Sequence, residues 1–281
     1  LELTTAVILI LFFNHARRFA KGPRYRFNRA GQWHEVTWEE CAARVYALAA
    51  ALVDLGVQPG DRVALLSATR AEWMETDLAI LSVGAITVPI YPSLLADECG
   101  YILWNSGATV AVAENERQAD KIGHVREHGF ELDGALIAVE LQHVLHIDGS
   151  GENCFDALLE KGRVRLPRLR GEIENRIAAQ KRDQLATIVY TSGTTGPPKG
   201  VMQTHGNHLA AVESLGRLRL LEPGDIDFFF LPLAHSFARM VEYLGLYLAT
   251  ITVYARSIDT LLEDVRESRP QVIPSVPRIY E

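Results

Sequence analysis

Apolar residues recur along the chain with two different periods, and the two periods alternate. Residues 37–56 carry an apolar residue every three or four positions, which is the spacing of one helical face. Thr37 and Glu40 form a capping-box pattern before this segment, and Gly56 ends it. Further helical segments are 71–84, 96–107, 204–218, 237–249 and 257–269, and strand-like runs between them are 62–67, 86–91, 109–114, 185–190, 227–232 and 251–255. Strands separated by helices predict an α/β fold with mostly parallel sheets flanked by helices.

Composition excludes several classes of protein. The chain has 281 residues, of which 48% are apolar and 22% are charged, and these values are ordinary for a globular protein with a sizeable core. A net charge of −7 argues against a nucleic-acid-binding protein. The cysteines Cys41, Cys99 and Cys154 are far apart and form no CxxC pair, so we expect neither a disulfide framework nor a zinc site.

The first residues form the most apolar segment of the chain. Residues 6–13 are all apolar, but a membrane span needs about 20 such residues. A secretory signal peptide would have a basic start, whereas Glu2 is acidic. We therefore expect a buried helix or an irregular terminus. The chain begins with Leu1 rather than Met, and we expect that the natural start lies elsewhere.

One charged segment interrupts the alternation of helices and strands. Residues 161–184 contain eight Lys or Arg residues and three Asp or Glu residues. They could form a polyanion-binding patch, but we favour a solvated linker or a surface helix between two subdomains. We accordingly divide the chain into a first α/β subdomain over 1–165, a charged linker over 166–184, and the start of a second α/β subdomain over 185–281.

The stretch from Tyr190 to Val201, YTSGTTGPPKGV, is rich in groups that bind phosphate. Glycines at 193 and 196 allow successive backbone N–H groups to curl around an anion. Hydroxyl groups and one ammonium group add further donors; they belong to Thr191, Ser192, Thr194, Thr195 and Lys199. The spacing does not fit the Walker P-loop, because Gly200 follows Lys199 where that motif has Ser or Thr. From the residues alone, a different phosphate loop and an ordinary Gly/Ser-rich loop remain open.

The same stretch resembles the signature of the adenylate-forming (AMP-binding) enzymes, which include the acyl-CoA synthetases. Residues 83–93, VGAITVPIYPS, resemble a glycine- and proline-containing segment of that family. Residues 231–240, LPLAHSFARM, and 276–281, VPRIYE, resemble segments of the long-chain fatty-acid:CoA ligases. The likeness runs in order from about residue 24 to the end. It implies the N-terminal portion of the large domain of the adenylate-forming fold.

The resemblance implies roles for particular residues. Members of the family join a carboxylic acid to ATP, release pyrophosphate, and then transfer the acyl group to coenzyme A, with Mg²⁺ sharing the phosphate charge. The implied contacts to the ATP phosphates are Thr191, Ser192, Gly193, Thr194, Thr195, Gly196 and Lys199. Lys199 and Thr195 are the implied catalytic residues, and His235 is implied at the substrate pocket. No metal ligand is assigned within this chain.

Other residues near these motifs have simpler interpretations. Arg239 lies one helical turn after His235, where an anion contact and a packing role are equally open. The apolar residues Phe237, Met240, Val241, Leu244 and Leu248 share a helical face, which we interpret as core rather than as an acyl tunnel. We interpret His205 and His208 as histidines on a helix surface, because no third metal ligand lies nearby.

Segments that family members carry after the one matched by residues 276–281 are not found in these 281 residues. They are a magnesium-binding glutamate segment, a ribose-binding Thr-Gly-Asp segment, and a small C-terminal domain with a catalytic lysine. We therefore expect that the chain stops inside the large domain and is nearly inactive alone.

The expected function is ATP-dependent activation of a long-chain fatty acid to acyl-adenylate and then to acyl-CoA. The alternatives are a ligase of the same superfamily for another carboxylic acid and a non-catalytic nucleotide-binding protein. The expected partners are therefore the small molecules fatty acid, ATP and coenzyme A, and the expected location is the cytoplasm, with contact to a membrane surface left open.

Overall fold

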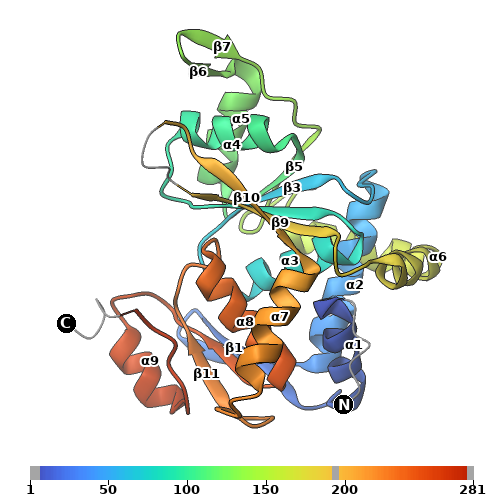
Figure 1. Ribbon diagram of the computed structural model, residues 1–281, viewed down its shortest axis with the longest axis vertical. Helices are drawn as coiled ribbons and strands as arrows, with labels where there is room; N and C mark the ends of the chain where they lie inside the picture. The colour runs from blue at the N-terminus through green and yellow to red at the C-terminus, as the bar shows by residue number, and fades with distance from the viewer. Residues whose placement is uncertain (1–6, 192–195, 277–281) are drawn as a thin grey trace.

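The computed structural model describes residues 7–191 and 196–276 (Figure 1). The helices are α1 (Ile8–Arg18), α2 (Trp38–Asp54), α3 (Ala71–Ser82), α4 (Ala96–Ser106), α5 (Glu116–His128), α6 (Phe155–Ala179), α7 (His205–Gly216), α8 (Ser236–Leu248) and α9 (Leu261–Ser268). The strands are β1 (Pro23–Arg29), β2 (Gln32–Thr37), β3 (Arg62–Leu66), β4 (Ile86–Ile90), β5 (Ala108–Ala113), β6 (Phe130–Leu132), β7 (Ala135–Ile137), β8 (His143–His146), β9 (Leu185–Thr191), β10 (Lys199–Thr204), β11 (Ile226–Phe229) and β12 (Ile251–Tyr254).

The larger sheet has six strands in the order β10-β9-β4-β3-β5-β8. Neighbouring strands from β9 to β8 are all parallel, and only β10 runs antiparallel to its neighbour β9. Helices connect the parallel strands, as the alternating periods predict. The expected α/β class with mostly parallel sheets flanked by helices is therefore confirmed.

Helices cover both faces of the six-stranded sheet. Figure 1 shows α4 and α5 on one side and α2, α3 and α6 on the other. Successive residues of β3 point to opposite faces, so Ala64 and Leu66 pack with α4 and α5, while Val63 and Leu65 pack with the other group. Burial on both faces explains why the strands read as continuous apolar runs.

A second sheet has four strands in the order β11-β12-β1-β2 and lies below the first in Figure 1. The β1–β2 hairpin turns at Ala30 and Gly31, which both have positive φ. Strand β1 pairs in parallel with β12, which lies more than 200 positions later in the chain. Each of the two larger sheets therefore takes strands from both sides of residues 166–184, so neither sheet is confined to one of the two expected subdomains.

The apolar N-terminal segment forms helix α1, as expected for a buried helix. Its side chains Phe12 and Phe13 pack against Trp38 and Tyr46 of α2, with ring centroids 6.0 Å and 4.5 Å apart. The predicted capping box of α2 is present, because the Thr37 side chain accepts from the backbone of Glu40 and the Glu40 carboxylate accepts from the backbone of Thr37. Within the described part of the chain, no helix is long and apolar enough to span a bilayer.

The charged segment after residue 161 belongs to one long helix. Residues 161–179 continue α6, which packs along α2 through buried side chains that include Leu158, Leu169 and Ile173. The two helices approach closely at Gly162, where an added Cβ would lie 1.8 Å from the carbonyl oxygen of Ala47. Arg163 and Arg168 are exposed, whereas Arg165 pairs with Asp54 of α2 and Arg176 bonds to the carbonyl oxygens of Val57 and Val83. This segment is thus a surface helix as far as residue 179.

Candidate functional site

The phosphate-rich stretch connects the two antiparallel strands β9 and β10. Thr191 ends β9 and Lys199 begins β10, and the two residues are paired across the ladder. The strands therefore bring both ends of the loop together, with Lys199 exposed. Gly196 has φ +90, a conformation that glycine adopts without strain. Ser192, Gly193, Thr194 and Thr195 lie outside the described residues.

Two residues of the stretch fix the base of this hairpin. Tyr190 is nearly buried, and its hydroxyl donates a hydrogen bond to Asn105 Oδ1 of α4 at 2.7 Å. Burial raises the pKa of Tyr190 to about 12, so the phenol stays protonated and can donate. Gly200 lies beside this ring, since an added Cβ would come within 3.2 Å of Tyr190 and 2.8 Å of Ile188. Packing at the base of the hairpin thus requires tyrosine at position 190 and glycine at position 200.

His235 caps the first turn of α8. Its Nδ1 accepts a hydrogen bond from the backbone N–H of Phe237 at 3.1 Å. A ring nitrogen that accepts carries no proton, so the proton of the neutral imidazole is on Nε2. His235 is exposed. It therefore offers one N–H donor at the start of a helix, where the helix dipole also favours an anion.

The structure links His235 to the far end of β10 rather than directly to Lys199. Gln203, near the end of β10, donates from Nε2 to Ser236 Oγ at 3.1 Å. Of the sequence-predicted site residues, Thr191 and Lys199 are thus brought side by side, and His235 is connected to them through the strand that Lys199 begins. Gln203 was not singled out from the sequence, because nothing local distinguishes it from a surface glutamine.

The buried side of α8 differs from the expected apolar face. None of the five apolar residues expected to pack into the core is fully buried, and Phe237 remains 41% exposed. The buried side instead carries Arg239, Glu242 and Tyr243. The expectation for this face is therefore met only in part. Val241 and Leu244 pack against the core while partly buried, whereas fully buried positions carry charges that are neutralised by partners from distant segments, which helical periodicity does not reveal.

Arg239 has a packing role within the core. It is 1% exposed and forms an ion pair with Asp77 of α3, while its Nε donates to the Tyr243 hydroxyl at 3.0 Å. Tyr243 in turn donates to Asp77 at 2.6 Å, and so does Thr87 of β4. This cluster joins α8 to α3 and to β4, a strand of the six-stranded sheet.

His205 and His208 are buried beside this cluster, so their interpretation as surface histidines is wrong. Burial, with a smaller contribution from the Arg239 charge, lowers the pKa of His205 to about 4 and that of His208 to about 3. Both imidazoles are therefore neutral at pH 7. The His208 ring lies edge-on to Tyr243 with centroids 5.1 Å apart. Their i, i+3 spacing on α7 serves packing.

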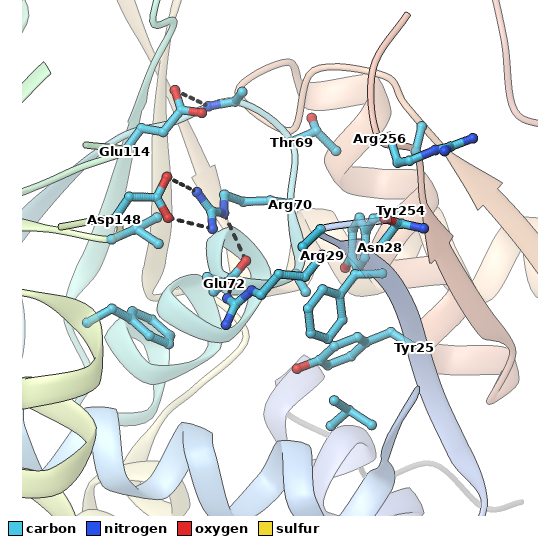
Figure 2. Close-up of a pocket in the computed structure, with 18 of the residues that line it drawn as sticks. Tyr25, Asn28, Arg29, Thr69, Arg70, Glu72, Glu114, Asp148, Tyr254 and Arg256 are labelled. Carbon is cyan, nitrogen blue, oxygen red and sulfur yellow. Dashed lines mark hydrogen bonds and ion pairs between the residues drawn. The ribbon is translucent and has the colours of Figure 1, made fainter. Parts of the chain in front are cut away.

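A cavity of about 620 Å³ lies at the carboxyl ends of β3, β5 and β8 (Figure 2). Residues 68–70, Glu114 and Asp148 follow these strands and line it, and the facing wall comes from β1 and the end of β12. Ligand sites in open parallel sheets commonly occupy this edge. The sequence signal for such a site is a polar residue directly after a buried strand, and Glu114, directly after β5, carries that signal.

Paired charges dominate this cavity. Arg70 binds both carboxylate oxygens of Asp148 at 2.7 Å and 2.9 Å, and its Nε donates to Glu72 at 2.8 Å (Figure 2). Burial alone would raise the pKa of Glu72, but the bond and charge of Arg70, a backbone hydrogen bond and the Arg29 charge together outweigh it, so the pKa is lowered. The arginines of the lining all have carboxylate partners; they are Arg29, Arg44, Arg70 and Arg256. Such a lining is unsuited to a long aliphatic chain.

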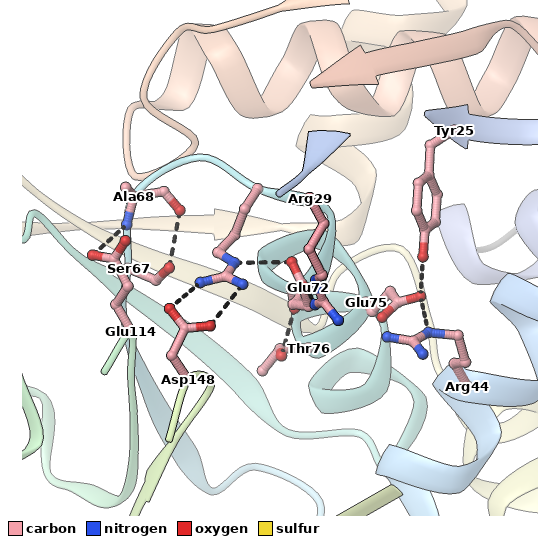
Figure 3. Close-up of polar contacts among 11 residues, drawn as sticks. Tyr25, Arg29, Arg44, Ser67, Ala68, Glu72, Glu75, Thr76, Glu114 and Asp148 are labelled. Atoms are coloured by element: carbon pink, nitrogen blue, oxygen red, sulfur yellow. Dashed lines mark hydrogen bonds and ion pairs between the residues drawn. The ribbon is translucent and has the colours of Figure 1, made fainter. Parts of the chain in front are cut away.

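Polar contacts of this region also connect the second sheet to helices that cover the six-stranded sheet. Tyr25 of β1 donates to Glu75 of α3 at 2.6 Å, and Arg44 of α2 donates to the same oxygen at 2.7 Å (Figure 3). Burial raises the pKa of Glu75 against the opposing effect of Arg44.

Within residues 7–191 and 196–276, no three His, Cys, Asp or Glu side chains are grouped so that they could hold a metal ion.

Comparison with curated proteins supports the resemblance seen in the sequence. The chain is 37% identical over 276 residues to the long-chain-fatty-acid–CoA ligase FadD15 of Mycobacterium bovis. This alignment covers 98% of the chain but 44% of the relative, so the chain spans less than half of that protein's length. The resemblance to the N-terminal part of a long-chain fatty-acid:CoA ligase is thus confirmed.

Solved structures show the same fold. The N-terminal domain of FACL13 from Mycobacterium tuberculosis matches with a TM-score of 0.78 at 22% identity, over 98% of this chain and 64% of that one. The long-chain-fatty-acid-CoA ligase FadD1 from Archaeoglobus fulgidus matches with a TM-score of 0.81 at 20% identity, over 99% of this chain and 53% of that one. The family model described as AMP-binding enzyme matches residues 12–281. The chain therefore belongs to the AMP-binding, or adenylate-forming, enzyme family.

Proposed function

We propose that the complete protein to which this chain belongs activates a long-chain fatty acid with ATP and transfers the acyl group to coenzyme A. The observation that carries this proposal is the 37% identity to a long-chain-fatty-acid–CoA ligase over nearly the whole chain, together with the signature stretch at 190–201. The chain spans 44% of that relative, so the activity is proposed for the complete protein and little of it is expected from these residues alone.

The proposed reaction has two steps. A fatty-acid carboxylate oxygen attacks the α-phosphorus of ATP, and the bond to the β-phosphate oxygen breaks so that pyrophosphate leaves. The thiolate of coenzyme A then attacks the acyl carbon, and AMP leaves. In the first step negative charge grows on the departing phosphates, so donors placed there before the reaction stabilise the transition state.

We assign the phosphate contacts to the loop between β9 and β10. Lys199 supplies a full charge, and it is paired with Thr191 where β9 and β10 meet the loop. The further contacts proposed are Ser192, Gly193, Thr194, Thr195 and Gly196. Lys199 and Thr195 are proposed to stabilise the leaving pyrophosphate. The antiparallel pairing of the strands supports this proposal, because it holds both ends of the loop together.

We assign His235 to the fatty-acid side of the reaction. Its Nδ1 is occupied by the cap of α8, so Nε2–H remains as a donor for a carboxylate oxygen. A donor of this kind orients the attacking group without taking its charge away. The charged cavity beside Arg70 is not proposed as the acyl site, because its lining would not bury an aliphatic chain.

Magnesium and coenzyme A belong to the proposed reaction, but this chain is assigned no residues for either. The described residues contain no group of three or more His, Cys, Asp or Glu side chains that could hold a metal ion. A long-chain fatty acid partitions into lipid, and we propose a cytoplasmic enzyme that meets its substrate at a membrane surface.

The experiment that tests the proposal is ATP–pyrophosphate exchange by the complete protein with a panel of acids. Palmitate and other long-chain acids are expected to stimulate exchange, whereas acetate, benzoate and single amino acids are not. Stimulation by an aryl or amino acid with none by palmitate would place the protein in another substrate class. No stimulation by any acid, with ATP still bound, would favour a non-catalytic nucleotide-binding protein.

A further inference from the structure

The short turn that precedes His235 is attached to other parts of the fold by side chains. This turn, residues 231–234, joins β11 to α8 and is closed by a hydrogen bond from His235 N to Pro232 O at 2.8 Å. Leu231, Leu233 and Ala234 are buried. Because the turn leads directly into the cap of α8, its position determines where the His235 imidazole lies.

Thr69 provides the first attachment. Its hydroxyl donates to the carbonyl oxygen of Leu231 at 2.7 Å and accepts from the backbone N–H of Leu233 at 3.0 Å. A single hydroxyl thus holds both sides of Pro232, using its proton and one lone pair. Thr69 follows β3 and also lines the charged cavity, where Figure 2 labels it.

Gln203 provides the second attachment, from the other side of the site. It lies on β10, the strand that begins with Lys199, and its amide donates to Ser236 Oγ. Ser236 is the first residue of the helix that His235 caps. The strand that leaves the phosphate loop is therefore bonded directly to the start of the helix on the proposed fatty-acid side.

The rest of α8 is fixed to the segment that carries Thr69. Asp77 of α3 accepts from Arg239 and Tyr243, which lie one and two turns after His235. Thr69 and Asp77 belong to the same connected segment, since α3 starts at Ala71. This segment thus contacts α8 twice, at the turn before it and at its middle, which leaves the His235 cap little freedom to shift.

We propose that Thr69 and Gln203 are positioning residues that set the place of His235 relative to the phosphate loop. The inference rests on the proposed function, in which His235 Nε2–H contacts the reacting carboxylate. Thr69 fixes the turn against β3, and Gln203 fixes the helix start against β10. A displacement of about 1 Å at a reacting group can lower a rate on the order of 100-fold, so two such bonds can matter greatly.

The first test compares Thr69→Val with Thr69→Ser in the complete protein. Valine keeps the shape but loses both bonds, whereas serine keeps the hydroxyl. Thr69→Val is expected to lower kcat for palmitate-dependent exchange about 10-fold or more, and Thr69→Ser to stay within about threefold. Equal activity of the valine variant and the unaltered protein would overturn the role of Thr69.

A second comparison separates positioning from a general loss of stability. Thr69→Val is combined with His235→Ala, and the two single variants are measured beside the double variant. If Thr69 acts through His235, the valine substitution has no further effect once the imidazole is absent. If Thr69→Val lowers exchange by the same factor with His235 present and with His235→Ala, the proposal is contradicted, because Thr69 then acts elsewhere.

A third measurement does not depend on catalysis. Long-range ¹H–¹⁵N spectra of histidine-labelled protein report which ring nitrogen carries the proton, and His235→Gln identifies the His235 signals. Thr69→Val and Gln203→Leu are expected to move these signals away from a fixed Nε2–H form, whereas Met202→Ala, at an exposed neighbour of Gln203, is not. Unchanged spectra in both Thr69→Val and Gln203→Leu would overturn the inference. Absence of acyl activation in the unaltered protein would instead overturn the proposed function and leave this result standing.

Discussion

Tyr243 of α8 donates its hydroxyl proton to Asp77 of α3 across 2.6 Å, although the two residues are 166 positions apart in the sequence. Asp77 also forms the ion pair with Arg239, and all three side chains are fully buried. The contacts of Asp77 with Tyr243 and Arg239 therefore attach α8, the helix whose first turn presents His235, to α3. Their contribution to the free energy of unfolding can be compared with that of an exposed ion pair in the same protein.

Removing the Asp77 carboxylate should destabilise the protein strongly. Asp77→Ala leaves the buried Arg239 charge without its partner, and such a loss costs roughly 3–5 kcal/mol of unfolding free energy. The control is Glu174→Ala, which breaks the exposed pair with Arg170 and should cost less than about 1 kcal/mol. Urea unfolding followed by circular dichroism measures both. Equal effects of the two substitutions would show that the buried cluster is not a structural anchor.

The packing of α6 on α2 should depend on one glycine. At Gly162 an added Cβ would lie 1.8 Å from the carbonyl oxygen of Ala47, whereas at Gly171 on the same helix it would meet nothing within 4 Å. Gly162→Ala should therefore destabilise the protein by roughly 2 kcal/mol or more through overpacking. Gly171→Ala should stabilise it by up to about 1 kcal/mol, since alanine is the better helix former. Thermal unfolding of both variants is the check, and a loss of stability at both positions would contradict this interpretation.

Stability should also depend on pH through Asp227. This carboxyl lies buried near Glu242, and Thr250 and Thr252 donate to it. Burial first, and then the Glu242 charge, raise its pKa from 3.8 to about 7 despite the nearby Arg24. Because the folded state holds this proton more tightly than the unfolded state, its stabilising effect is complete below about pH 4 and is lost as the pH rises through about 7.

Asp227→Asn removes this titration while it keeps a carbonyl oxygen for the two threonines. Relative to the unaltered protein, the variant should gain roughly 2–3 kcal/mol of unfolding free energy between pH 5 and pH 8. The measurement is urea unfolding of both proteins at each pH, and comparing them cancels the titration of every other group that the substitution leaves alone. A difference that stays constant with pH would show that Asp227 ionises normally.

Local sequence signals predicted much of the fold. The Thr37–Glu40 capping box requires only residues three positions apart, and it is present. Buried strands such as β3 and β4 were recognised because they are apolar on both faces. The β1–β2 hairpin gave no such signal, since more than half of its strand residues are polar or charged and its pairing with β12 joins distant segments.

The site was predictable only in part, for a related reason. The stretch 190–201 could be recognised from its own composition, and the structure places its two ends side by side. The contacts of Thr69 with residues 231–234 and of Gln203 with Ser236 could not be foreseen, because they connect residues far apart in the sequence. The same distance hid the burial of His205 and His208, which lie near residues of β9 and α8.

Loss of the loop lysine should lower activity without unfolding the protein. Lys199→Ala removes the charge proposed to stabilise the departing pyrophosphate, and palmitate-dependent exchange should fall on the order of 100-fold. Lys181→Ala, at an exposed lysine before β9, serves as the control and should leave exchange unchanged. Both variants should keep the melting temperature of the unaltered protein. Normal exchange by Lys199→Ala would remove this residue from the proposed site.

The most direct measurement mixes the complete protein with ATP labelled at the α-phosphate and palmitate, without coenzyme A. The account predicts that label moves from ATP into palmitoyl-adenylate in a single turnover, and that adding coenzyme A then converts this label into AMP while palmitoyl-CoA forms. Label that remains in ATP, or that appears in ADP with no acyl-adenylate at any time, would contradict the central claim that this chain is part of a fatty-acid-adenylating enzyme.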